Sequence, residues 1–135
     1  MPTFNHHSVR ARNKQTKFGI IIGGLTYEWQ FDNLFTASRT KPIVAMDIES
    51  LGVLDTDPWF GSVPLKPTLR RIAIEIKRIE SSDCSYPCII VTEIGLIDGF
   101  HRLLKNYLQG ISMVNCVEFT ISELMKLPHL IVRKD

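Results

Sequence analysis

Residues 96–110 read Leu-Ile-Asp-Gly-Phe-His-Arg-Leu-Leu-Lys-Asn-Tyr-Leu-Gln-Gly, and this stretch decides the fold class of the chain. It starts with an apolar pair, which is followed by polar residues around a glycine. The next apolar residues are spaced as on one buried face of a helix, and they are Phe100, Leu103, Leu104, Tyr107 and Leu108. Gly110 stands where a left-handed residue commonly ends a helix. The stretch therefore predicts an extended segment, a turn at Gly99 and a helix that begins near Phe100.

The segments on both sides of this stretch predict an alternation of helices and strands. Residues 68–80 begin with Thr68, a good N-cap residue, and then show an apolar stripe at helical spacing, made of Leu69, Ile72, Ala73, Ile76 and Ile79. Arg71 and Glu75 are four residues apart on another face, where they are expected to form a mildly stabilising pair. Residues 88–92 and 112–119 are short, β-branched stretches that predict strands. The order helix, strand, helix, strand predicts an α/β (α+β) fold, a small mixed sheet with helices.

The rest of the chain has weaker signals. Strands are predicted for residues 18–22, 25–35 and 43–48, and a loop for 36–42. Residues 55–67 contain three prolines and should be irregular. Residues 122–127 predict a short last helix, capped by Ser122 and stopped by Pro128.

Length and charge predict one domain with a basic tail. The chain has 135 residues, of which 44% are hydrophobic and 22% charged, as in an ordinary globular domain. Residues 1–17 carry no acidic residue and four basic ones, Arg10, Arg12, Lys14 and Lys17. We therefore expect a flexible basic tail over residues 1–17 and a single domain over residues 18–135. Such a tail either contacts nucleic acid or an acidic partner, or is simply solvated.

The composition also argues against membranes, disulfides and metal. No apolar run approaches the roughly 20 residues of a membrane helix, and the N-terminus lacks the apolar segment of a secretory signal. The odd number of cysteines, Cys84, Cys88 and Cys116, is a poor disulfide framework, and their spacing does not predict a metal site. The sequence thus predicts a cytoplasmic protein without membrane contact.

The chemistry is predicted at residues 98–102, between the apolar strand and the helix. The first turn of a helix has backbone N–H groups without intrahelical partners and a partial positive charge, so it attracts anions. Gly99 lets the backbone approach a ligand, Arg102 offers a fork for phosphate oxygens, and His101 can carry a proton near neutral pH. Asp98 either caps the helix or helps to hold a divalent cation. His101 and Arg102 could instead serve the fold alone, paired with Asp98 or another carboxylate.

Roughly residues 43–119 resemble the ParB/sulfiredoxin superfamily, and the resemblance is specific across residues 67–119. The resemblance rests on an ordered set of features: an amphipathic helix, Pro87 with a short strand, Asp-Gly-x-His-Arg opening a helix at residues 98–102, Gly110 and a further strand. It is close to the small stand-alone ParB-like domains that carry this motif.

The resemblance implies a nucleotide, such as ATP or CTP with Mg²⁺, or a nucleic-acid phosphate at the helix start. The implied binding residues are Asp98, Gly99, Phe100, His101, Arg102 and Arg71. His101 and Arg102 would be the catalytic pair of an NTPase, a phosphotransferase or a nuclease, with His101 as acid/base. Phe100 replaces the reactive cysteine of sulfiredoxin, so sulfinic-acid repair is not expected. The chain ends at Asp135, which leaves no room for the DNA-reading helix-turn-helix domain of the partition proteins.

A second hypothesis belongs to a different class of protein. The fold would serve as a non-catalytic interaction or inhibitor module of plasmid or phage origin, and residues 1–35 would form a partner-binding extension. The two hypotheses differ in the site that they predict. An open pocket at Gly99 with converging Arg102 and His101 favours ligand binding, and a pocket filled by Trp29, Trp59 or the N-terminal segment favours the module.

Overall fold

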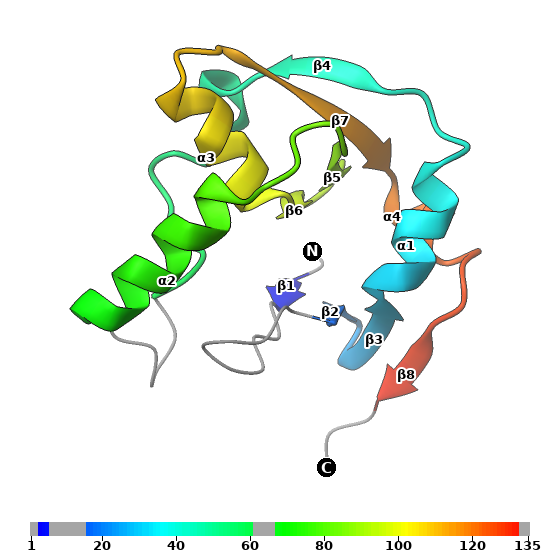
Figure 1. Ribbon diagram of the computed structural model, residues 1–135. Coiled ribbons are helices and arrows are strands. Elements are labelled where there is room, and N and C mark those ends of the chain that lie inside the picture. The colour runs from blue at the N-terminus through cyan, green and yellow to red at the C-terminus, as the bar shows by residue number, and fades with distance from the viewer. Residues whose placement is uncertain (1–2, 6–15, 61–66, 133–135) are drawn as a thin grey trace.

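The computed structural model describes residues 3–5, 16–60 and 67–132, and these form a mixed α+β fold (Figure 1). The strands are β1 (Thr3–Asn5), β2 (Lys17–Ile22), β3 (Leu25–Gln30), β4 (Val44–Asp47), β5 (Cys88–Val91), β6 (Gly95–Asp98), β7 (Met113–Phe119) and β8 (Leu130–Val132). The α-helices are α1 (Phe31–Ser38), α2 (Leu69–Glu80), α3 (Phe100–Leu108) and α4 (Ile121–Leu124), and a 3-10 turn, η1, spans Glu49–Leu51. The predicted fold class is confirmed.

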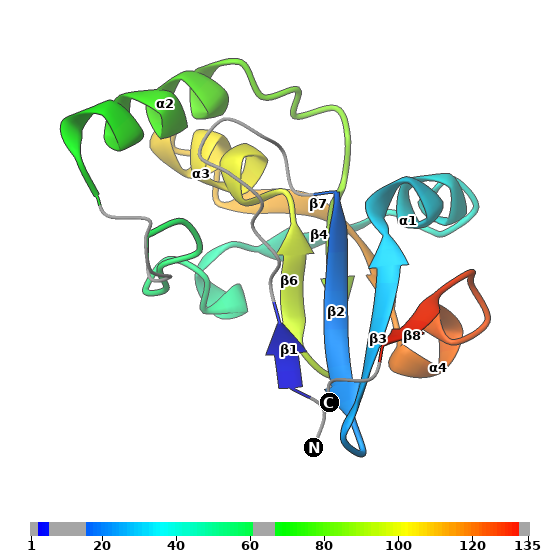
Figure 2. The same cartoon turned by 90° about the horizontal axis from the view of Figure 1, so that it is seen from below.

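The strands form two sheets instead of one. The first sheet is antiparallel and has the order β1-β2-β3-β8. The second has the order β4-β7-β5-β6 and is mixed, because β5 and β7 run parallel while the other pairs are antiparallel. Helices α2 and α3 lie side by side, and α1 lies on the opposite side of the molecule in both views (Figures 1 and 2).

The main core lies between the two sheets. It combines aromatic residues of the first sheet with β-branched residues of the second, and its largest buried side chains include Phe18, Trp29, Ile89 and Ile97. The rings of Phe18 and Trp29 stack with centroids 5.3 Å apart, an arrangement that adds to their burial. Trp29 Nε1 donates to the backbone oxygen of Leu124 at 2.8 Å. That bond gives the buried indole N–H a partner. It also attaches α4 to the first sheet.

A second core lies on the other face of the mixed sheet. There Leu103 of α3 packs with Cys88, Ile90 and Cys116 of the sheet. The sheet is therefore covered on both faces, by the first sheet and by α3. This explains why all four residues of β5 are buried and read as one apolar run.

The chain from Leu25 to Ser38 corrects two predictions. The predicted strand 25–35 ends at Gln30, and α1 replaces both its last part and the start of the predicted loop 36–42. Phe31 and Leu34 are three residues apart and both buried, so the buried positions follow the spacing of a helix and not the alternation of a strand. A hydrogen bond also stabilises the change from strand to helix at this point: Phe31 N–H donates to the backbone oxygen of Thr16 at 2.9 Å.

The C-terminal segment corrects a third prediction. Thr120, and not Ser122, caps α4, and its side chain accepts from Glu123 N–H while the Glu123 carboxylate accepts from Thr120 N–H. This reciprocal capping box satisfies two orphan donors at once. The chain then forms β8, which pairs with β3 and which the sequence analysis did not predict.

The other predicted elements are present, close to their expected bounds. Thr68 caps α2 and accepts from Arg71 N–H at 3.2 Å. Gly110 follows α3 with a φ of +78°. In the predicted tail, β1 pairs with β2, which starts at Lys17, and residues 6–15 lie outside the described residues. Residues 61–66 of the predicted irregular segment also lie outside them. Within the described part of the chain, no helix has the length and apolar character needed to cross a membrane.

Candidate anion site at the start of α3

The turn from β6 into α3 requires a glycine. Gly99 is buried and has a φ of +102°, in the region that side chains rarely adopt. A Cβ atom at this position would lie 2.5 Å from Cys88 Sγ, well inside van der Waals contact. The backbone of the motif therefore lies directly on the mixed sheet, with Cys88 Sγ 3.4 Å from the Gly99 carbonyl oxygen that accepts its S–H.

Cys88 forms the floor of this turn as a neutral thiol. Its hydrogen bond with Cys116, and then its burial, raise the pKa of the Cys88 thiol. A thiol that stays protonated is a poor nucleophile. Cys88 therefore supports Gly99 by packing.

Arg102 spans the start of α3 and the end of the preceding loop. Its Nη2 donates to Asp98 Oδ2 at 2.7 Å and to the backbone oxygen of Pro87 at 3.2 Å. Burial acts to lower the pKa of Arg102, but the Asp98 carboxylate and Cys88 outweigh it, so this pKa is raised and the guanidinium stays charged. Its Nε is buried without a hydrogen-bond partner among the described residues.

Asp98 does not cap α3, which corrects one of the two roles predicted for this residue. The N-cap position is Gly99, which has no side chain to offer, and Asp98 instead forms the ion pair with Arg102. The reason is geometric: residue 98 still belongs to β6, and its carboxylate is one helical turn away from Arg102. The first turn of α3 is thus left without a side-chain cap.

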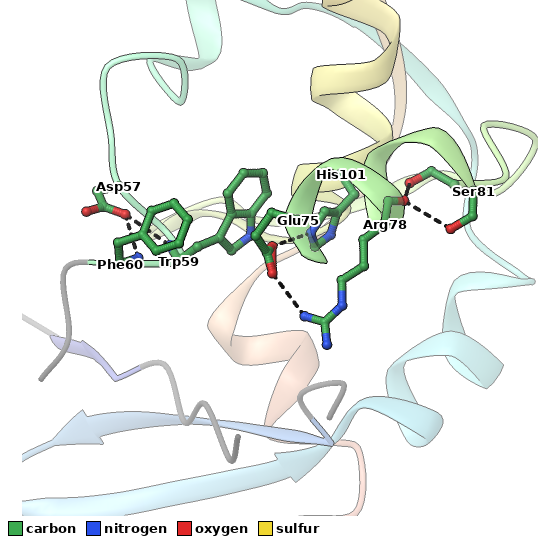
Figure 3. A network of polar contacts seen from close by, with 8 residues as sticks. Asp57, Trp59, Phe60, Glu75, Arg78, Ser81 and His101 are labelled. Atoms are coloured by element: carbon green, nitrogen blue, oxygen red, sulfur yellow. Dashed lines mark hydrogen bonds and ion pairs between the residues drawn. The ribbon is translucent and has the colours of Figure 1, made fainter. Parts of the chain in front are cut away.

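His101 is held by a buried carboxylate from α2 (Figure 3). Its Nε2 lies 2.8 Å from Glu75 Oε2, while Glu75 Oε1 accepts from Arg78 Nη1 at 3.1 Å. Glu75 is only 3% exposed, so its charge depends on these two partners. The Trp59 ring stacks on the imidazole, with centroids 4.6 Å apart and planes inclined by 16°. Three separate segments therefore fix the position of one imidazole ring.

Arg71 is the least satisfied polar side chain near the site. Its Nε and Nη1 are buried and have no hydrogen-bond partner within the described part of the chain. The predicted pair of Arg71 with Glu75 is not formed, because Glu75 turns to Arg78 and His101. A buried donor without a partner is costly, and more so when it is charged. Arg71 thus has donors available for a ligand.

These side chains line a cleft of about 760 Å³. Its walls come from the end of α1 and the loop after it, from α2, and from the start of α3. The cleft is lined by five arginine or lysine side chains, which are Arg39, Lys41, Arg71, Arg78 and Arg102, and by three carboxylates, which are Glu75, Asp83 and Asp98. Glu75 and Asp98 are paired with arginines, and Lys41 is paired with Glu123 outside the lining. Among the described residues, Arg39 and Arg71 are left against Asp83, so the unpaired charge of the lining is positive and suits an anion.

The cleft brings together all six predicted binding residues, from Arg71 to the motif at 98–102. Lys105 of α3 does not line the cleft and donates to the backbone oxygens of Glu80 and Ser82. Arg70 is exposed and does not line the cleft. Of these two neighbouring arginines, Arg71 thus lines the cleft and Arg70 is exposed outside it.

Sequence reasoning did not place Arg39 or Lys41 at the site. It named Trp59 only as a residue that could fill the pocket, and Glu75 only as the helix partner of Arg71. No local pattern carries this information, because residues 39–41 and 59 reach the cleft through the tertiary fold. A signal for Glu75 does exist: it lies four residues after Arg71 and three before Arg78, so these three share one face of a helix.

Among the described residues, no group of three or more His, Cys, Asp or Glu side chains could hold a metal ion. Asp98, the residue considered as a ligand for a divalent cation, is paired with Arg102. A magnesium ion at this cleft would be held mainly by the phosphates that accompany it, as is common for nucleotides.

Comparisons of the chain with protein-family models, with curated proteins and with solved structures find no match.

Proposed function

We propose that this protein binds the phosphate group of a nucleotide, such as ATP or CTP, or of a nucleic acid in the cleft between α2 and α3. One observation carries the proposal: two arginines that line a positively charged cleft have buried guanidinium nitrogens, Nε and Nη1 of Arg71 and Nε of Arg102, without a hydrogen-bond partner among the described residues. Nearly all buried polar groups in folded proteins have partners. A phosphate accepts several hydrogen bonds at once and pairs with the charge of both arginines.

The start of α3 supports the same ligand. No side chain caps this helix, so its first N–H groups and its dipole can be used by an anion. Gly99 lets the turn lie directly on Cys88 with a positive φ, and so it sets the start of α3 in place. Together with the ordered motif of residues 98–102, this is the basis on which we propose membership of the ParB/sulfiredoxin superfamily.

The pair of Glu75 and His101 supports acid–base chemistry on the bound phosphate. If Nε2 donates its proton to Glu75 across the 2.8 Å contact, the other ring nitrogen is left as an acceptor. That nitrogen would take a proton from an attacking water or hydroxyl group, and Arg102 would stabilise charge on the phosphate. The activity that follows is phosphoryl transfer, nucleotide hydrolysis or phosphodiester cleavage, with Mg²⁺ supplied alongside the ligand.

A thermal-shift screen of ATP, ADP, CTP and GTP with magnesium tests the proposal. A ligand at about 100 times its dissociation constant adds roughly 2.7 kcal/mol of stability, which raises the melting temperature of the wild type. The Arg71→Ala and Arg102→Ala variants should lose most of this shift. Arg70→Ala is the matched control, because it removes the same charge from the adjacent, outward-facing position, and it should keep the shift.

Two results would contradict phosphate binding in the cleft. One is the absence of a shift with any nucleotide and with a short single-stranded oligonucleotide. The other is an equal loss in Arg70→Ala and Arg71→Ala, which would mean that the ligand senses overall charge only.

A second candidate function, a protein-interaction module, is supported by the outer face of α2. Leu69 is 86% exposed and Ile76 49% exposed on this face, and exposed apolar patches commonly mark binding surfaces. The cleft itself favours the first candidate, because Trp29 lies in the core and Trp59 stands at the cleft wall against His101. A pull-down with wild type and Leu69→Lys tests the module: recovery of no protein partner at a stoichiometric level would count against it.

A further inference from the structure

A second, smaller hollow adjoins the cleft, and we call it the Trp59 pocket. Its volume is about 270 Å³, and it is lined by Val53, Leu54, Thr56, Asp57, Pro58, Trp59, Phe60, Phe100, Leu103 and Leu104. Sites for whole drug-sized ligands are about 300–1,000 Å³ in volume. The Trp59 pocket is therefore of a size for one ring system instead of a complete nucleotide.

The side chains that line the Trp59 pocket favour an apolar, planar group as its ligand. No arginine or lysine lines it among the described residues. Its two polar residues are already engaged: Thr56 Oγ1 donates to the Val53 oxygen at 2.6 Å, and Asp57 Oδ1 accepts from Trp59 N–H and Phe60 N–H at 3.1 and 2.7 Å. A phosphate would find no cation here, whereas the face of a planar ring would find aromatic and aliphatic carbon.

The aromatic walls are positioned by the turn that carries them. Figure 3 shows Asp57 bonded to the backbone of the next two aromatic residues. The rings of Trp59 and Phe60 are perpendicular, with centroids 6.4 Å apart and planes inclined by 82°. Trp59 is held on its other side by His101. A surface prepared in this way loses little side-chain entropy when a ring binds to it.

The Trp59 pocket and the cleft share part of their walls. Pro58, Trp59 and Phe100 line both of them. The anion site and the apolar pocket are thus neighbours, with Trp59 in the wall of both. A ligand that joins a phosphate to a planar ring fits this pair of sites better than a phosphate alone.

We propose that the Trp59 pocket binds the nucleobase of the ligand whose phosphate lies in the cleft, a site that discriminates nucleotides from other phosphate compounds. This inference rests on the proposed phosphate site and adds its specificity. The same base chemistry is present in a free nucleotide and in single-stranded nucleic acid, so both sources must be compared.

Isothermal titration of the full chain, with magnesium present, separates the base from the phosphates. The probes are ATP, CTP, inorganic tripolyphosphate, which has the phosphates without a base, and a short single-stranded oligonucleotide. The variant is Leu104→Trp, which fills the pocket from a residue that does not line the cleft. The matched control is Leu108→Trp, one turn further along α3, where the side chain is exposed and lines neither site.

Wild type should bind ATP or CTP about 10- to 100-fold more tightly than tripolyphosphate, the range that stacking of one base on aromatic groups supplies. Leu104→Trp should remove this advantage and leave tripolyphosphate binding unchanged, and Leu108→Trp should change neither. If Leu104→Trp does not fold, Phe60→Ala should show the same selective loss. An oligonucleotide that binds in place of the free nucleotides, with the same sensitivity to Leu104→Trp, supports the base pocket and identifies a strand as the source.

The negative results are distinct. Equal affinities for tripolyphosphate and the nucleotides, or an equal loss of both in Leu104→Trp, overturn the base pocket and leave the phosphate site standing. No binding of any probe overturns the phosphate site and the base pocket together.

Discussion

Helices α2 and α3 have the same kind of sequence but differ in how they pack their apolar stripe against the protein. Each has an apolar stripe at helical spacing, and each was expected to bury it. In α3 the stripe is packed on the mixed sheet at Leu103, which is 1% exposed, and only its end is exposed. In α2 the stripe is exposed from Leu69, at 86%, up to its last residue, Ile79, which is buried, while Glu75 on the polar face is also buried. Periodicity thus identified both helices, but it indicated the packed face of only one.

The position of each helix in the layers explains this difference. α3 covers the sheet directly, so its apolar residues enter the second core. α2 lies against α3 (Figure 1) and turns Arg71, Glu75 and Arg78 to the cleft. The cost of burying the Glu75 carboxylate is offset by Arg78 and His101. The polar face of α2 is buried at Glu75, which holds His101. A buried polar face departs from the usual pattern of exposed polar residues, and such departures are typical of functional sites.

Truncation of matched leucines should give the largest difference between the two helices. Leu103→Ala should lower the free energy of unfolding by about 2–5 kcal/mol, because it leaves a cavity in a packed core. Leu69→Ala should change it by no more than about 0.5 kcal/mol. Urea denaturation followed by circular dichroism measures both. Similar losses for the two variants would show that α2 buries its apolar stripe in solution.

Removal of the buried charge on α2 should have the next largest effect. Glu75→Gln should lower the free energy of unfolding by about 1.5–3 kcal/mol, the range for hydrogen bonds to charged groups, because it weakens the contacts with Arg78 and His101. Glu80→Gln on the same helix is the control, since Glu80 is exposed, and it should stay within about 0.5 kcal/mol of wild type. An unchanged stability in Glu75→Gln would mean that the polar face does not hold α2 in place.

The caps of the two helices should give the smallest effect. Thr68→Ala removes the acceptor for Arg71 N–H and should cost about 1 kcal/mol. Thr68→Ser keeps a hydroxyl acceptor and should restore most of that loss. The start of α3 has no side-chain cap to remove. Equal stability of the two Thr68 variants in the same denaturation assay would show that the cap does not contribute.

Local sequence was sufficient for much of the fold and for part of the site. The spacing of residues 68–80 and 96–110 predicted α2 and α3 with their start and end signals, and β5, β6 and β7 followed from short β-branched runs. The prediction failed at residues 31–38, where an aromatic segment fits both strand and helix patterns. It also failed at α4, where Thr120 and Ser122 are both good caps and only the reciprocal bonds with Glu123 separate them.

The sequence by itself determined the elements around the Asp-Gly-x-His-Arg motif, because caps, glycines and hydrophobic spacing act over a few residues. It also located Gly99, whose positive φ only glycine adopts readily. The tertiary structure alone decided that Glu75 holds His101, that Trp59 stacks on it, and that Arg71 lines the cleft with two nitrogens that have no partner among the described residues. These contacts join residues about 25 to 45 positions apart, and such pairings depend on how whole layers pack, which no local pattern encodes.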